Sequence, residues 1–502
     1  MSLEVSLANA RSGVALIGRQ LSQTAADIAN AGTAGYTDKR VEARSLAARG
    51  QPMGVRALPA ERLVDAALAA RLLSARSADA AAALRQASLA RIEQAHGSVA
   101  GQQSLADLTA RLNEGLLALR DMPGDPARQR AAVAAAEDLA QRFHAISDTI
   151  TLVRQDAQDG MVAEVAAINA RLREIARLTD EIRPELAAGR SVAELEDRRD
   201  AAIARLAESL EITVLRAADG GVTLVTRGGT TLPLDRDRDM LAIATANVGA
   251  SAYYGPGGTL TGVMLGGTDV TASLGGGRLG EYRSLRDGTL PRMQAELDVL
   301  ATGFAARFEA QGLRLFETPA GAVPDPTLAY TASGAMGFAR TIRVSPAVIA
   351  DPSLLRDGTH AAPGFTPNPP GGPASFTGLL DRLLTFALGP EQAAGVPHPG
   401  FAAAGLGPDG SLLARVVPQG SLAAQATQVV AVQTAERAEA SRAAESAATL
   451  RTGLEGRFAQ MSGVDMDREM AAMVMLQNAY AANARVISAV QQMFDALLGA
   501  VR

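Results

Sequence analysis

The sequence predicts a mainly α-helical protein: a long-helix bundle with discontinuous coiled-coil helices at its N- and C-termini and inserted β-rich segments. Three observations support this fold class. Apolar residues recur at alternating spacings of three and four near both ends of the 502-residue chain, as in a coiled-coil seam. Long stretches rich in Ala, Arg and Leu lie between these ends, and aromatic residues make up only 3% of the chain. Near residue 210 the apolar repeat changes from that of a helix to that of a strand.

The composition argues against several classes of function. Hydrophobic residues make up 47% of the chain, enough for a large core, and the net charge of −5 without a basic stripe argues against nucleic-acid binding. No cysteine is present, which removes disulfides, thiolate nucleophiles and sulfur-dependent zinc sites. Lys39 is the single lysine among 48 basic residues, and it follows Asp38, so a phosphate-binding Gly-Lys motif is missing.

The chain shows no signal for membrane insertion or for a cleaved secretory leader. No run of 18 apolar residues occurs, which predicts no transmembrane helix. Near the N-terminus, Glu4 precedes any basic residue and Arg11 interrupts the apolar stretch, unlike a signal peptide. We therefore expect that any export of this chain proceeds without a cleaved leader.

The first predicted region, 1–60, is a terminal helix followed by an extended segment. The helix seam over 1–31 consists of Leu3, Leu7, Ala10, Val14, Ile17, Leu21, Thr24 and Ile28. We expect Leu7, Val14, Ile17, Leu21 and Ile28 to pack against other subunits. Gly32 and Gly35 end the helix, because glycine readily takes the backbone conformation that follows a helix.

The second predicted region, 61–208, is a long-helix domain. A segment with helical composition extends from about 61 to 120 and ends in a turn that contains Pro123 and Pro126. The stretch over 127–183 would span about 85 Å as one helix, with Asp159-Gly160 as a candidate interruption.

The central part of the chain, 209–420, is predicted to alternate between β-rich and helical segments. Residues 209–277 are predicted to be a β-rich insertion, starting with a hairpin that turns at Asp219-Gly220-Gly221. Residues 278–312 return to the helical domain. Residues 313–420 are dense in Pro and Gly and are expected to form an outer domain of their own.

The last predicted region, 421–502, is helical to the C-terminus. Its seam consists of Met473, Leu476, Tyr480, Asn483, Ile487, Val490, Phe494, Leu497 and Val501. We expect the residues from Leu476 to Leu497 to pack between subunits. The single polar member, Asn483, is typical of a residue that fixes the register of a coiled coil.

Motifs that would carry chemistry are weak. Residues 275–280 match G-x-G-x-x-G but lack the βαβ context of a dinucleotide site, and 235–239 lack the glycine and glutamate of a calcium loop. The four histidines are scattered. The sequence therefore predicts no catalytic residue, cofactor site or metal site.

Two passages resemble the terminal signatures of the axial proteins of the bacterial flagellum, the family of rod, hook and hook-associated proteins. The first contains Asn30, Gly32, Gly35, Tyr36 and Thr37, with Ala34 where the family usually has Pro. The second contains Ser462, Gly463, Val464 and, further on, Arg485. Between them, Ile168-Asn169, the run over 196–200 and Gly276–Gly280 occur in an order that resembles the first of the two hook–filament junction proteins.

This resemblance implies a structural adaptor, not an enzyme, that joins hook to filament and polymerises by packing of its terminal helices. The implied partners are further copies of the chain, the hook protein, the second junction protein, a cytosolic export chaperone and the flagellar type III export apparatus. The implied location is extracellular, at the hook–filament junction.

Alternative functions remain open at this point. The chain could be another axial component, such as the hook protein, a distal rod protein or the second junction protein, although its long helical region argues against the hook protein. A lipid-surface amphipathic helix protein would require basic and aromatic flanks that the N-terminal seam lacks. A cell-wall hydrolase would need a catalytic site that the sequence does not show.

Overall fold

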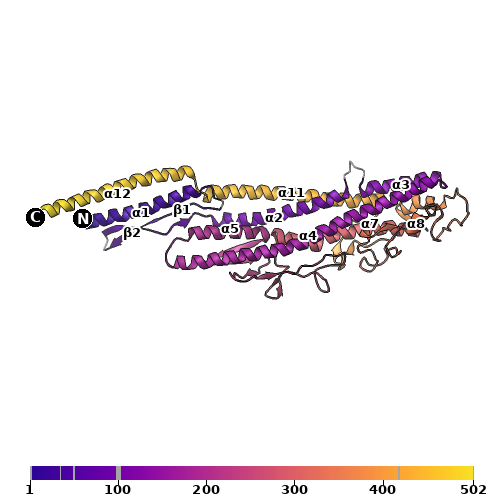
Figure 1. Cartoon of the computed structure of the whole chain (residues 1–502), viewed down its shortest axis with the longest axis horizontal. Coiled ribbons are helices and arrows are strands. Elements are labelled where there is room, and N and C mark those ends of the chain that lie inside the picture. Colours follow the sequence, from indigo (N-terminus) through magenta and orange to yellow (C-terminus); the bar gives the residue numbers. More distant parts are fainter. Residues whose placement is uncertain (1–2, 34, 49–50, 98–102, 417–418, 501–502) are drawn as a thin grey trace.

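The fold was analysed in a computed structural model, which describes residues 3–33, 35–48, 51–97, 103–416 and 419–500. The molecule is elongated, and its first and last helices lie side by side at one tip (Figure 1). Two of the sequence predictions, at Ala34 and Val501, lie outside the described residues. The fold is mainly helical with small antiparallel strand pairs, as the sequence predicts.

The backbone of the molecule is α4 (Pro126–Ala187), an uninterrupted helix of 62 residues. It starts where the sequence favours a helix: the Asp125 side chain accepts a hydrogen bond from the Ala127 amide, and Pro126 occupies the first turn. The predicted long helix is therefore confirmed, and Asp159-Gly160 does not interrupt it. Gly160 lies against the Tyr282 ring, which leaves no room for a side chain.

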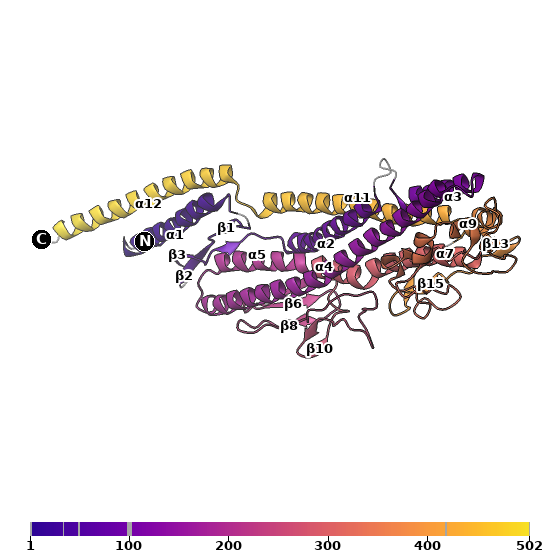
Figure 2. The same cartoon turned by 45° about the vertical axis from the view of Figure 1, so that its right-hand side comes forward.

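Helices α2 (Ala66–His96), α3 (Leu105–Asp121) and α5 (Ala193–Ser209) pack against α4, and α11 (Leu422–Ser462) packs against α2 and α3. The expectation of continuous helical text over 61–120 is wrong near Gly97, where α2 ends and the chain turns; Ser104 and Asp107 then cap α3 reciprocally. Helix α11 lies along α2, and ion pairs such as Arg76–Glu455 and Arg451–Asp79 join the two helices (Figure 2).

Short antiparallel strands fill the insertions. In the terminal part they are β1 (Lys39–Arg40), β2 (Ala43–Ala48), β3 (Gln51–Ala57) and β4 (Glu61–Arg62). In the β-rich insertion they are β5 (Ile212–Arg216), β6 (Val222–Thr226), β7 (Thr231–Leu232), β8 (Leu241–Ala242), β9 (Met264–Leu265) and β10 (Thr268–Asp269). The predicted hairpin is confirmed as β5–β6, with Ile212 opposite Thr226. Asn169 of α4 bonds the backbone of Met240 and Leu241 and so attaches β8 to the long helix.

The helix predicted over 278–312 is present as α6 (Gly277–Ser284), a π-helical turn over Leu285–Thr289, and α7 (Leu290–Ala310). Helix α6 begins at Gly277. A Cβ on this residue would lie 2.5 Å from the Ser209 carbonyl carbon, so a larger side chain would collide with that backbone. The glycine-rich motif is thus explained by a close approach of two backbones.

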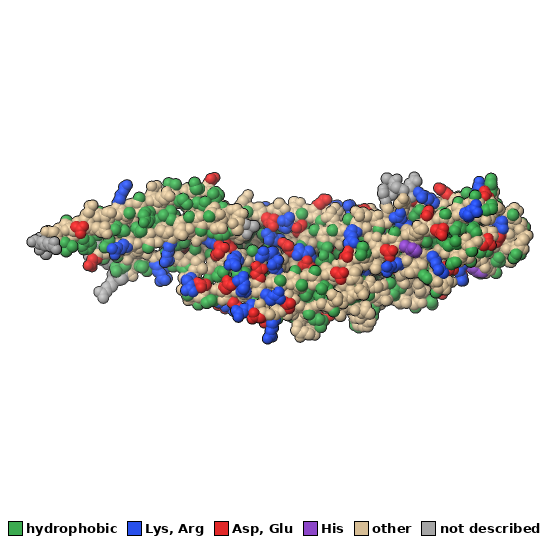
Figure 3. Space-filling view, viewed as in Figure 1, with side chains coloured by type: hydrophobic (Ala, Val, Ile, Leu, Met, Phe, Trp, Pro, Cys, Tyr) green, Lys and Arg blue, Asp and Glu red, His purple; other side chains and the backbone are tan. Residues whose placement is uncertain are grey.

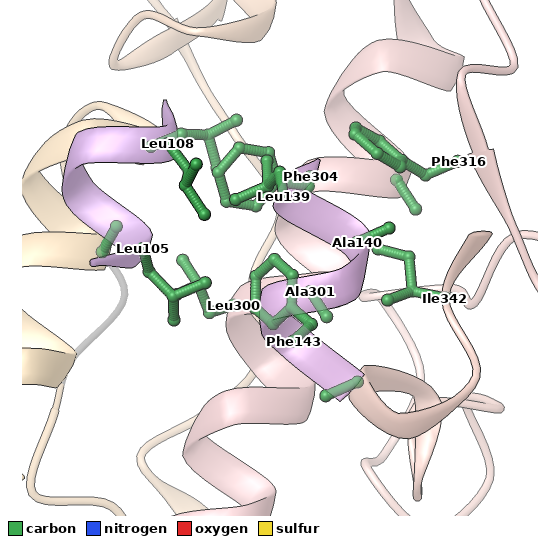
Figure 4. Packing of buried hydrophobic residues seen from close by; sticks show 14 of the residues in the cluster. Leu105, Leu108, Leu139, Ala140, Phe143, Leu300, Ala301, Phe304, Phe316 and Ile342 are labelled. Atoms are coloured by element: carbon green, nitrogen blue, oxygen red, sulfur yellow. The ribbon is translucent and has the colours of Figure 1, made fainter. Parts of the chain in front are cut away.

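The main core lies between α3, α4 and α7. Phe143 of α4 and Phe304 of α7 pack edge to face, with ring centres 5.8 Å apart, and Phe316 packs against Phe304 in the same way (Figure 4). All three rings are fully buried.

Residues 313–420 do not have a separate main core. The segment contains β11 (Phe316–Glu317), β12 (Arg343–Val344), α8 (Pro346–Ala350), α9 (Leu354–Asp357), α10 (Gly378–Arg382), β13 (Glu391–Ala393), β14 (Val396–Pro397), β15 (Ala404–Leu406) and β16 (Leu412–Leu413). Its buried Phe316, Phe338 and Ile342 belong to the same cluster as Phe143 and Phe304. The expectation of a domain of its own is wrong in this respect, because the loops fold back onto the helices and share their core.

The molecule ends in two helices, within the region that the sequence predicts to be helical from residue 421 onward. Helix α11 stops at Ser462, and α12 (Met466–Ala500) begins after Gly463, Val464 and Asp465. At this break the chain leaves the long bundle and joins α1 (Leu3–Asn30) at the tip (Figure 1).

Candidate assembly surface at the terminal helices

Helices α1 and α12 pack against each other along the tip of the molecule. They run antiparallel: Thr24 of α1 bonds Glu469 at the start of α12, whereas Gly13 lies beside Asn483 further along. Ala10, Ile17 and Val490 are the buried apolar residues of this pair among the described residues, at 4%, 7% and 3% exposure. The interface is therefore thin.

Asn483 occupies a defined place in this pair. A Cβ on Gly13 would lie 3.1 Å from the Asn483 Oδ1 atom, so the glycine makes room for the amide. The Asn483 Nδ2 atom donates to the Ala479 carbonyl of its own helix at 3.0 Å, not to α1. The Asn483 side chain thus packs over a glycine, and the register role that the sequence suggests for it stays a prediction.

The predicted packing residues divide into two groups. Those at least half-buried between the helices are Leu7, Val14, Ile17, Leu21, Ile28, Leu476, Asn483, Ile487, Val490 and Phe494. Tyr480 and Leu497 are exposed, at 45% and 55%. The first group thus packs largely within one chain, and whether these residues also contact other subunits stays a prediction.

Sequence reasoning missed an apolar surface on α12 outside the seam. Met475, Val486 and Met493, here called the outer stripe, are exposed at 67%, 47% and 48%. They are separated by eleven and seven residues, whole numbers of turns, so they lie on one face of the helix. Hydrophobic side chains crowd this tip in the space-filling view (Figure 3). The signal was present in the sequence as apolar residues between the seam positions.

The N-terminal signature lies where the tip meets the bundle. Gly35 has a φ of 83°, and it turns the chain after α1 so that Tyr36 folds back, with its hydroxyl donating to Asp27 at 2.7 Å. The Thr37 hydroxyl donates to Asp197 of α5 at 2.7 Å. Two passages singled out in the sequence, 30–37 and 196–200, are thus brought together in space.

The remaining signature residues have simpler places. Asn30 bonds the Ala26 carbonyl at the end of α1, beside Gly32. The Ser462 carbonyl accepts from the Asp38 amide at 2.8 Å, and Gly463 and Val464 form the turn between α11 and α12. Arg485 is exposed on α12.

Burial raises the pKa values of three acidic groups at this site. Burial raises the pKa of Asp27, and the hydrogen bond from Tyr36 opposes the rise. Burial, together with the nearby Asp38 carboxylate, raises the pKa of Glu469. The Tyr36 pKa is raised as well, through burial and its bond to Asp27. No helix in the described part of the chain is long and apolar enough to cross a membrane, and no acidic or histidine cluster there has a metal-binding arrangement.

Comparisons with known proteins relate the chain to proteins of the bacterial flagellum. Residues 89–319 match the family of the flagellar hook-associated protein FlgK helical domain, and residues 456–500 match the C-terminal family of the flagellar basal body rod FlgEFG proteins. The chain is 23% identical to flagellar hook-associated protein 1 of Bacillus subtilis (strain 168), over 95% of this chain and 94% of the relative. It is also similar to the flagellar hook junction protein FlgK from Burkholderia pseudomallei, with a TM-score of 0.41 and 22% identity. That match covers 50% of this chain and 46% of the solved one, so the chain spans less than half of it. The family-model match and the curated relative thus both indicate similarity to flagellar hook-associated protein 1.

Proposed function

We propose that this chain is a structural adaptor that joins the flagellar hook to the filament and polymerises through its terminal helices. The observation that carries the proposal is the tip itself. Similarity to flagellar hook-associated proteins supports a role in the flagellum, and the α1–α12 pair presents exposed apolar side chains that association would bury. Further copies of the chain are the occupants that this surface fits.

The outer stripe supplies the driving force. Fully burying one side chain of this type is worth about 1.5–3 kcal/mol, so Met475, Val486 and Met493 together favour association. A contact between different faces of neighbouring copies repeats around an axis and builds a ring or a helical array. The adaptor would thus be built by terminal helices of many copies lining one tube.

The proposal includes the partners and the location. The hook protein and the second junction protein would contact the two ends of the array, and an export chaperone and the type III apparatus would deliver the chain outside the cell. We propose no catalytic activity, because the family is structural.

The proposal is tested by substituting Val486→Arg in the encoded protein. The charge would be buried at every contact in the array, at a cost of several kcal/mol for each copy. We expect a secreted and folded protein, hooks without filaments in electron micrographs, and loss of motility.

A matched control uses Leu215→Arg. Leu215 is exposed at 55% on β5, away from the tip, and the same residue type replaces it. This variant should swim normally. Normal swimming of Val486→Arg cells would show that α12 does not assemble through the outer stripe.

A further inference from the structure

The tip and the long bundle share no hydrophobic core. We define the terminal body as residues 3–65 and 463–500, and the rod as residues 66–462. The clusters of buried hydrophobic residues found in the described chain lie entirely within the rod. The buried Ala10, Ile17 and Val490 of the terminal body belong to none of them. The joint between the two bodies is therefore held by polar contacts.

Asp197 of α5 is the centre of these contacts. It is only 5% exposed, and it accepts from the Lys39 Nζ atom at 2.6 Å and from the Arg62 Nη1 atom at 3.0 Å. Both the amide and the hydroxyl of Thr37 also donate to it. One rod carboxylate thus binds three residues of the terminal body.

The surrounding charges complete a network across the joint. Arg62 also pairs with Glu196 at 3.0 Å and with Asp200 at 2.8 Å, and these carboxylates keep its pKa raised although burial opposes this. Glu194 lies 3.6 Å from the Lys39 ammonium. All four carboxylates belong to α5 in the rod, whereas both cations belong to the terminal body.

The Lys39 side chain fits the narrow space between Tyr36 and Asp197. Its Nζ atom lies 3.1 Å from the centre of the Tyr36 ring, and its side chain is 3% exposed. The compact ammonium fits between the ring and Asp197, where the wider guanidinium of arginine would need more space. Lys39 is also the single lysine of the chain, so its amine is chemically unique apart from the N-terminus.

Ionic joints differ from apolar joints in how they open. When an ion pair separates, both charges regain their hydration. The free energy needed to open the pair is therefore much smaller than the Coulombic attraction between the two charges. Salt further favours the separated state, since the screening length falls from about 10 Å at 0.1 M to about 3 Å at 1 M. A groove of about 330 Å³ within the terminal body, between α1, residues 38–41 and α12, reaches Lys39 and so lies beside the joint.

We propose that Asp197, Lys39 and Arg62 form an ionic latch that holds the terminal body in one orientation on the rod and releases it to reorient. The two chain crossings, near residues 63–65 and 463–465, act as its hinges. The latch is a property of the monomer and does not depend on the proposed function.

The first test measures acylation of Lys39 by an N-hydroxysuccinimide ester in the purified full chain, with peptide mass spectrometry as the readout. In the wild type at low salt, Lys39 should be protected. Asp197→Asn removes the charge that binds Lys39 and should accelerate acylation at least tenfold. The control Asp239→Asn breaks an exposed ion pair with Arg173 on the rod and should leave the rate unchanged. Equal rates in Asp197→Asn and the wild type would overturn the latch, as would rapid acylation of the wild type at low salt.

The second test needs no change at the latch. Because the chain has no cysteine, the double variant Ser22→Cys, Thr452→Cys can be spin-labelled at two defined sites. Both sites are exposed, one on α1 and one on α11. Pulsed electron resonance should give one narrow distance at 0.1 M salt and a broad distribution at 1 M salt. The same narrow distribution at both salt concentrations would show a rigid joint and overturn the proposal, even if Asp197→Asn fails to fold.

Discussion

At the scale of single residues, two buried carboxylates of the rod are each surrounded by several partners. Glu436 of α11, 3% exposed, lies within ion-pair distance of Arg85, Arg292 and Arg415. Asp298 of α7 is fully buried and accepts from the Gln294 side chain, the Tyr330 hydroxyl and the amides of Gly337 and Ala339. These carboxylates attach distant segments to the helices, because a buried charge without partners would cost several kcal/mol.

Asp298 gives the rod a specific pH dependence. Burial raises its pKa to about 6, and the hydrogen bonds that favour its charged form reduce the rise. The folded protein therefore binds this proton more tightly than the unfolded chain, so stability from this group is present below about pH 4 and lost as the pH rises through about 6. The difference from the ordinary value of 3.8 corresponds to about 3 kcal/mol.

The prediction is measured with Asp298→Asn, which cannot ionise. We expect the free energy of unfolding of the wild type, relative to this variant, to fall between pH 4 and pH 7 in urea titrations. A relative stability that rises over the same interval would mean that the hydrogen bonds outweigh burial and that the pKa is lowered instead.

At the scale of elements, the continuity of α4 rests on packing and not on local preference. Glycine in a helix interior lowers helix stability by about 1 kcal/mol relative to alanine, so the sequence predicts a possible break at Gly160. A Cβ at this position would lie 2.4 Å from the Tyr282 Cζ atom. The glycine lets α6 approach α4 closely, and the approach stabilises the helix that glycine would otherwise weaken.

We therefore predict opposite effects of Gly160→Ala in two backgrounds. In the wild type the added methyl group collides with the Tyr282 ring and should destabilise the protein by about 1–3 kcal/mol. In a Tyr282→Ala background the collision is absent, and the same change should stabilise the protein by up to about 1 kcal/mol. Thermal unfolding of the four proteins of this cycle measures both effects. Stabilisation in both backgrounds would refute the packing explanation.

Elements with a strong local signal could be predicted from the sequence, and contacts between them could not. The apolar periodicity identified α4 and the terminal seams, and the glycine turn identified the β5–β6 hairpin. The latch joins Lys39 to Asp197 across 158 residues, and no local pattern encodes such a pairing. The shared core of Phe316 and Phe304 was missed for the same reason, since prolines and glycines in 313–420 describe its turns but not the surface on which it folds.

At the scale of the whole molecule, stability is distributed unevenly along the long axis. Helix α4 contributes to both large core clusters of the rod, with residues such as Phe143, Ile146 and Ile168 fully buried. The α1–α12 pair, in contrast, buries few apolar residues and has no cluster in common with the rod. Terminal helices that are stabilised mainly by neighbouring copies should be weakly held before assembly.

Hydrogen exchange of the purified monomer should reveal this gradient. Amides of α1 and α12 should exchange on the order of 100-fold faster than those in the middle of α4, because local opening needs less free energy where few apolar contacts are lost. Gly13→Leu, which fills the place of Asn483, should accelerate exchange in α1 and α12 further and leave α4 unchanged. Val486→Arg, at an exposed position, should change neither region in the monomer. Exchange in α1 as slow as in α4 would show that the terminal body is stable by itself, and assembly would then have to use a surface that is already rigid.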